Sequence, residues 1–114
     1  MPRRARRPPR YAGPVILEHA LLPVIPGLEA EFETAFDEAR HVIASMPGFV
    51  DLTLSRGVES PSSYLLLVHW TSVEAHERGF RGSPEYERWR ALLHRFYEPF
   101  PVVEHFETVV SVPA

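Results

Sequence analysis

Apolar residues repeat along the chain with two periods, one typical of strands and one typical of helices. A period of two predicts three strands, and a fourth segment that is apolar on both faces predicts a central strand. The four segments are Val15–Leu22, Phe49–Val58, Tyr64–Trp70 (the central one) and Phe100–Val110. Between the first two, Gly27–Met46 carries apolar residues at the spacing of an amphipathic helix, and Pro47-Gly48 ends it.

The stretch after the central strand predicts two helices with a break between them. Thr71-Ser72-Val73-Glu74 fits a capping box, and Gly79 and Gly82 interrupt the short helix that follows. Ser83-Pro84 begins a second helix, because proline at the first helical position loses no needed donor. The apolar face of this second helix consists of Tyr86, Trp89, Leu93, Phe96 and Tyr97.

The order β-α-β-β-α-α-β predicts an α+β fold in which the helices cover one face of a four-stranded antiparallel sheet. We expect His19, with Leu17 and Leu21, to lie on the covered face beside Trp70. The uncovered face would then carry apolar residues that a second copy could bury, which predicts a homodimer. Those residues are Ile16, Ala20, Leu65 and Leu67.

Length and charge indicate one domain with a distinct tail. A chain of 114 residues forms one domain, for which we expect residues 13–114, after a disordered Arg/Pro-rich tail at 1–12. Five of the twelve basic residues lie in Met1–Arg10, so the remainder has seven arginines against fifteen acids. An acidic body argues against nucleic acid as a partner.

Several kinds of chemistry have no sequence support. The chain has no cysteine, which excludes disulfides and thiolate catalysis. The histidines show no HxxH or HExxH spacing, and no glycine-rich phosphate loop or GxSxG elbow occurs, so we expect neither a metal nor a nucleotide cofactor. No apolar run approaches the roughly 20 residues of a membrane span. The paired arginines near the N-terminus suggest an export signal, but the segment after them carries Glu18 and His19 and has no small-residue cleavage site. We therefore expect a cytoplasmic protein without a membrane partner.

The helical region resembles a known family. Trp70, then Glu74–His76, Ser83–Tyr86 and Trp89–Leu93, is similar to the second half of an antibiotic biosynthesis monooxygenase (ABM) domain. The likeness runs from about Val15 to Val110. It implies a ferredoxin-like βαββαβ protomer and a dimeric α+β barrel.

The candidate catalytic residues are His19, His76 and Arg90. A histidine suits proton transfer near neutrality, although a lone strand histidine is more often structural. In quinone-forming ABM members a tyrosine and an arginine stand at places similar to His76 and Arg90. Those members also carry an asparagine where Leu66 stands here. Arg90 could stabilise an anion, or simply pair with Glu87.

The candidate substrate-binding residues are aromatic: Trp70, Tyr86 and Trp89. Trp70 could form a wall that stacks a planar substrate, or be an ordinary core residue. Together with these residues, the resemblance implies a cofactor-independent monooxygenase that acts on a small aromatic, phenolic or polyketide-like compound. An electron-rich phenolate or enolate can itself reduce oxygen, so the protein need only bind it, deprotonate it and stabilise the anion.

Two alternatives stay open. Haem-binding or haem-degrading members of the same fold use a first-strand asparagine, a third-strand tryptophan and a histidine on the last helix. Trp70 fits, but His19 and Arg90 or Trp89 stand at the other two positions, with His94 one turn further on. The second alternative is a dimeric small-molecule-binding protein without catalysis.

Overall fold

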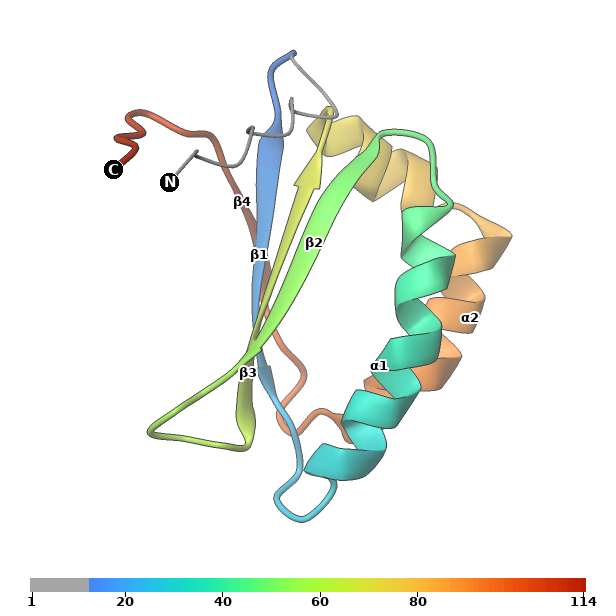
Figure 1. Cartoon of the computed structure of the whole chain (residues 1–114). Coiled ribbons are helices and arrows are strands. Elements are labelled where there is room, and N and C mark those ends of the chain that lie inside the picture. The colour runs from blue at the N-terminus through green and yellow to red at the C-terminus, as the bar shows by residue number, and fades with distance from the viewer. Residues whose placement is uncertain (1–12) are drawn as a thin grey trace, which may run out of the picture.

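The computed structural model describes residues 13–114 (Figure 1). The predicted tail therefore lies outside the described residues. In chain order the elements are β1 (Ile16–Pro23), α1 (Glu29–Ala44), β2 (Phe49–Arg56), β3 (Ser63–Trp70), the π-helix η1 (Ala75–Phe80), α2 (Pro84–Leu93), the 3₁₀ turn η2 (His94–Phe96) and β4 (Val103–Phe106).

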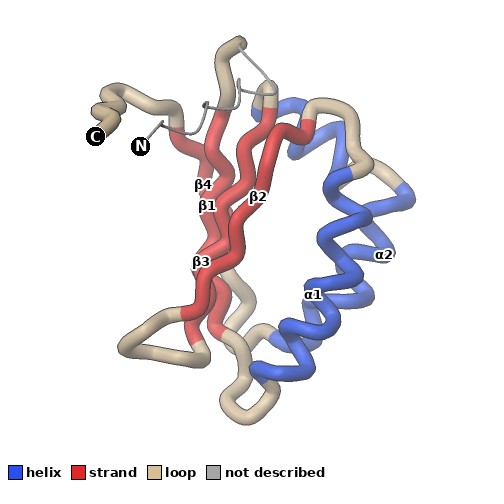
Figure 2. The backbone as a smooth tube through the Cα atoms, in the orientation of Figure 1, coloured by secondary structure: helices blue, strands red, loops and turns tan. Residues whose placement is uncertain are grey.

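The four strands form one antiparallel sheet in the order β2-β3-β1-β4, and the helices cover one of its faces (Figures 1 and 2). This is the α+β fold that the periodicity predicts, and the ferredoxin-like arrangement that the family resemblance implies. The doubly apolar strand β3 is central, as expected. The last strand is shorter than predicted, because only Val103–Phe106 pairs with β1.

Local signals act at Ser83, as predicted, and one residue later than predicted at the first helix start, where Ser72 and not Thr71 is the cap. Ser72 Oγ accepts a hydrogen bond from the Ala75 N–H at 3.1 Å, and Ser83 Oγ accepts one from the Tyr86 N–H at 3.2 Å. These two caps start the helical segments on either side of the break. After α1, Gly48 adopts φ of 84° and its carbonyl accepts from the Thr71 N–H at 2.9 Å, which ties the end of α1 to the end of β3.

The two faces of β1 are the reverse of our prediction. The β1–β3 register pairs Ile16 with Trp70 and His19 with Leu67, and directly paired residues lie on the same side of a sheet. The helices therefore cover the face of Ile16 and Ala20, not that of His19. Both alternating sets of β1 are mostly apolar, so the sequence pattern did not decide which set faces inward.

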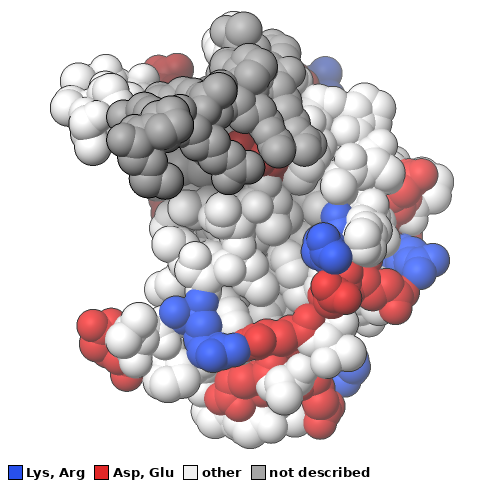
Figure 3. Space-filling model, in the orientation of Figure 1, with Lys and Arg blue, Asp and Glu red and all other residues white. Residues whose placement is uncertain are grey.

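The core between sheet and helices is largely aromatic. Phe32 of α1 is fully buried, and its ring lies 4.9 Å from Tyr64 and 5.6 Å from Phe96. On the surface, carboxylates and arginines lie side by side over α1 (Figure 3), as in the pairs Arg56–Glu33 and Arg88–Glu38. This face of the described chain thus has no continuous basic surface of the kind that binds nucleic acid backbones.

Candidate functional site

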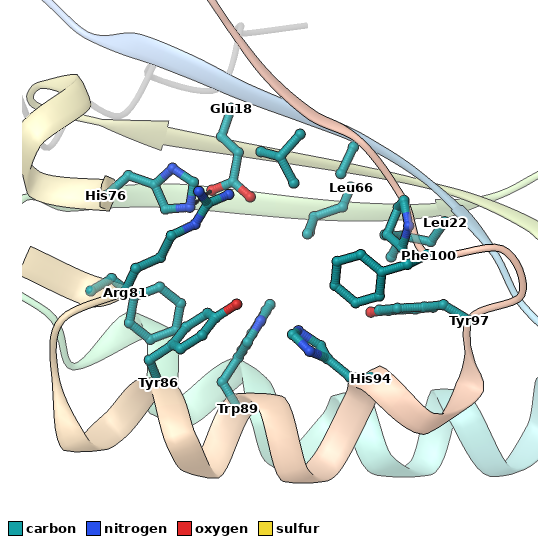
Figure 4. A pocket seen from close by; sticks show the side chains of 14 residues that line it. Glu18, Leu22, Leu66, His76, Arg81, Tyr86, Trp89, His94, Tyr97 and Phe100 are labelled. Atoms are coloured by element: carbon teal, nitrogen blue, oxygen red, sulfur yellow. Dashed lines mark ion pairs between the residues drawn. The ribbon is translucent and has the colours of Figure 1, made fainter. Parts of the chain in front are cut away.

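A small cavity lies between the sheet and α2, and it encloses about 60 Å³ (Figure 4). Its walls come from β1, β3, the η1 region, α2 and the segment that leads into β4. The lining residues are Glu18, Ala20, Leu22, Leu66, His76, Phe80, Arg81, Tyr86, Trp89, His94, Tyr97, Phe100, Pro101 and Val103. Figure 4 shows Glu18, His76 and Arg81 at one end, and His94, Tyr97 and Phe100 at the other.

Glu18 supplies a buried carboxylate to the first end. Glu18 is only 5% exposed, and its Oε1 accepts a hydrogen bond from Trp70 Nε1–H at 2.8 Å. His76 Nε2 lies 3.3 Å from the same oxygen. Burial raises the pKa of Glu18, while the Trp70 hydrogen bond and the Arg81 charge oppose that rise. A carboxylate with a raised pKa is a stronger base than an exposed one.

His76 lies beside Glu18 on the π-helix η1, an uncommon element that is frequent at functional sites. Its ring stacks on Trp70 with centroids 5.4 Å apart and planes at 19°. His76 Nδ1 lies 2.8 Å from His105 Nε2 on β4. Burial, with the charges of Arg81 and His105, lowers the pKa of His76 to about 3, so this imidazole stays neutral near pH 7.

Arg81 brings a positive charge to the same end. Its side chain is 37% exposed and extends toward Glu18 and His76 (Figure 4), and its Nη1 lies 3.9 Å from Glu77. A guanidinium at this place keeps its charge and can stabilise an anion in the cavity. The buried Glu18 carboxylate and the half-exposed Arg81 guanidinium thus lie at the same end of the cavity.

The opposite end is aromatic and uncharged. His94 and Tyr97 lie at this end, and Tyr86 and Trp89 project from α2 between it and Arg81 (Figure 4). Burial raises the pKa of Tyr97, and burial together with Arg90 and Arg81 lowers the pKa of His94. Both groups are therefore neutral at pH 7, which suits a planar aromatic ligand with polar edges.

The structure brings together only part of the predicted site. His76, Tyr86 and Trp89 line the cavity, and Trp70 lies directly behind His76 as a fully buried support for it and for Glu18. His19 is on the other face of the sheet, where its ring lies 5.6 Å from Phe106, so its predicted place beside Trp70 was wrong.

Arg90 is also outside the cavity. Its side chain is 59% exposed, and Nε lies 3.8 Å from Glu87, which is the alternative that the sequence left open. Arg90 belongs to the solvent-facing side of α2, because Trp89 and Leu93 form the buried side.

Three residues of the site were missed: Glu18, Arg81 and His105. The signal for Glu18 was present, because it is the only acidic residue in β1. Our prediction placed His19, and not Glu18, on the face of β1 that the helices cover, and so passed over this signal. Arg81 follows the end of η1, and His105 is far from His76 in sequence, so only the pairing of β4 with β1 brings His105 opposite Glu18.

The chain is similar to a known protein family over most of its length. The family profile described as Antibiotic biosynthesis monooxygenase matches residues 15–92, and the chain belongs to this family. Uncharacterized protein YczJ of Bacillus subtilis (strain 168) is 52% identical over 95 residues, which is 83% of this chain and 100% of that protein.

Solved structures of proteins described as oxygenases have the same fold. A crystal structure from Bordetella bronchiseptica that bears the family's name superimposes with a TM-score of 0.81 at 34% identity, covering 85% of this chain and 99% of that one. SnoaB, a cofactor-independent oxygenase from Streptomyces nogalater, gives a TM-score of 0.74 at 25% identity, covering 90% of this chain and 100% of its own. Within residues 13–114 no helix is long and apolar enough to cross a membrane.

Proposed function

We propose that this protein is a cofactor-independent monooxygenase whose substrate is a small planar phenol or enol. The observation that carries the proposal is the buried Glu18 carboxylate, held by Trp70 and His76 at the end of an aromatic cavity. The similarity to SnoaB, which is described as a cofactor-independent oxygenase, supports this class of reaction.

The chemistry needs a base and a charge partner. Glu18 would take the proton of the substrate hydroxyl, and the Arg81 guanidinium would stabilise the resulting anion. The electron-rich anion then reduces O₂ at a ring carbon that carries two hydrogens in its keto form. One oxygen atom stays on that carbon as a carbonyl and the other leaves as water, so the substrate supplies all four electrons that O₂ takes up and no external reductant is required.

Substrate entry requires the cavity to widen. A volume of about 60 Å³ is well below the roughly 300–1,000 Å³ of pockets that hold drug-sized ligands. The wall formed by Tyr97, Phe100 and Pro101 has no regular secondary structure beyond one isolated bridge, and Phe100 is 60% exposed. We expect this segment to move aside when a phenol binds.

Oxygen uptake tests the proposal. With a dihydroxynaphthalene under air, and without added flavin or metal, the wild type should consume one O₂ per substrate and release a hydroxynaphthoquinone that has gained one oxygen atom. Glu18→Gln should lower kcat by about 10²-fold or more, because the amide cannot accept the proton. Arg81→Lys should lower turnover more than Arg90→Lys, since only Arg81 lines the cavity. Uptake that is unchanged in Glu18→Gln would contradict the mechanism.

A binding function without catalysis is the second candidate. The aromatic walls formed by Phe80, Tyr86 and Trp89 favour a planar ligand whether or not a reaction follows. If phenols bind in the cavity and none supports oxygen uptake, this candidate replaces the first. A haem function has no comparable support, because β1 lines the cavity with Glu18, Ala20 and Leu22 and not with an asparagine.

We also propose that two copies pair through the sheet face opposite the helices. Leu21 is 56% exposed and Phe106 is 48% exposed, and the register places them on the side of His19 with Leu17, Leu65 and Leu67. This set replaces Ile16 and Ala20 of our prediction, which face the helices. A self-complementary apolar face is what a two-fold dimer requires. A cytoplasmic location stays a prediction from the sequence.

A further inference from the structure

Three titratable side chains form an unbroken line from the cavity to the edge of the sheet. Glu18 Oε1 lies 3.3 Å from His76 Nε2, and His76 Nδ1 lies 2.8 Å from His105 Nε2. Glu18 and His76 are 5% and 3% exposed, whereas His105 is only half-buried and belongs to the edge strand β4. His105 is therefore the member of the line nearest to solvent.

Hydrogens can occupy this line in two complete ways. With Glu18 ionised, a hydrogen on His76 Nε2 would face the carboxylate oxygen across the 3.3 Å contact, and His105 Nε2–H would donate to His76 Nδ1. With Glu18 protonated, its O–H donates to His76 Nε2, His76 Nδ1–H donates to His105 Nε2, and His105 carries its hydrogen on Nδ1. Each imidazole is neutral in both arrangements. The two arrangements differ by one proton, which enters or leaves at His105 Nδ1.

We propose that Glu18, His76 and His105 are one proton path, through which the buried carboxylate exchanges its proton with solvent at the β4 edge. His105 is then a positioning residue, because it acts on the cavity only through His76. The use of this path to reset Glu18 between turnovers rests on the proposed oxygenase function. The existence of the path does not.

The surroundings favour a change of tautomer over a change of charge. Trp70 Nε1–H can only donate, so Glu18 Oε1 accepts its hydrogen bond in both arrangements. Arg81 is the permanent charge that faces Glu18 and His76, and its charge opposes a second cation there. The other titratable groups on this cavity are Tyr86, which lies near Arg81, and Tyr97 and His94, which line the far end (Figure 4).

Imidazole nitrogen chemical shifts, measured by NMR across a pH titration of the full chain, test the path without reference to activity. We expect His76 and His105 to carry hydrogen on Nε2 at high pH and to switch together to Nδ1 as Glu18 takes up its proton. Glu18→Gln should abolish the switch. Its amide oxygen must still accept from Trp70, which keeps His76 in the Nε2–H form at every pH. Tautomers that stay fixed in the wild type, or that switch independently of each other, would overturn the proposal.

A variant at the outer end tests the use of the path. His105→Ala should lower kcat about tenfold or more with little change in KM, and added imidazole should restore turnover. A purely structural role would give no rescue. If the wild type consumes oxygen and His105→Ala equals it, the path has no part in turnover. If the wild type consumes no oxygen, the proposed function fails while the tautomer measurement still decides whether the path exists.

Discussion

At the scale of single residues, Glu18 is the most costly side chain in the cavity. A buried carboxylate loses hydration that one indole hydrogen bond, one imidazole and a half-exposed guanidinium restore only in part. This cost is typical of sites whose chemistry needs a perturbed group. Stability and function should therefore respond in opposite directions when the charge is removed.

Glu18→Gln should make the protein more stable at pH 7. The folded state raises the pKa of Glu18 above its ordinary 4.5, so this group favours folding below that value and the gain is lost as pH rises through the folded pKa. We expect the variant to exceed the wild type by about 1 kcal/mol or more at pH 7. Urea unfolding at several pH values measures this. A difference that persists below pH 4.5 would contradict the assignment.

His76 should make the wild type sensitive to acid. The folded state lowers its pKa from 6.5 to about 3, so the stability that the neutral ring provides is present above pH 6.5 and is lost as pH falls toward 3. At pH 5 the loss from this group is about 2 kcal/mol, at roughly 1.4 kcal/mol per unit. His76→Gln should show a smaller drop between pH 7.5 and pH 5 in the same unfolding experiment. An equal drop in both proteins would show that another group is responsible.

At the scale of elements, the sequence predicted more of the fold than of the site. The strands, α1 and both helix starts follow from periodicity and from Ser72 and Ser83, since these signals are local. The sequence did not predict which face of β1 points toward the helices, because both faces are mostly apolar and only packing against α2 decides between them. One reversed strand was enough to put His19 in place of Glu18. His105 depends on long-range strand pairing, which no local pattern contains.

The turn between α1 and β2 is where backbone conformation and close packing coincide. A Cβ on Gly48 would lie 2.6 Å from Ala75 Cβ at the start of η1, and φ is +84°. Gly27 has a similar φ of +96° with no atom within 4 Å of the same position, so it is the matched control. Gly48→Ala should cost roughly 2–4 kcal/mol and Gly27→Ala about 1 kcal/mol. Thermal unfolding that lowers Tm equally in both would show that the contact with η1 has no energetic role.

At the scale of the whole molecule, the helices cover one face of the sheet and leave the other open (Figure 2). The strand register places several leucines and Phe106 on the open face. The cavity lies on the covered face, so assembly through the other face would leave the site intact. The fold thus separates the site from the surface that we propose for pairing.

Leu67→Arg should dissociate the proposed dimer. Leu67 pairs with His19 and Thr53 on the open face, and a buried unpaired charge there costs several kcal/mol. Sedimentation should show two chains per particle for the wild type and one for the variant. Ala91→Arg, on the exposed side of α2, should leave the dimer unchanged. A wild type that is monomeric at micromolar concentration would contradict the pairing.

Ionisation of a bound phenol tests the central claim most directly. Under argon, a naphthol whose phenolate absorbs at longer wavelength than its neutral form can be titrated into the protein at a pH below its own pKa. We predict that the phenolate band grows with binding to the wild type, and that Glu18→Gln binds the same naphthol without the band. A neutral spectrum in the wild type at saturation, or a phenolate band that survives Glu18→Gln, would contradict the assignment of Glu18 as the base.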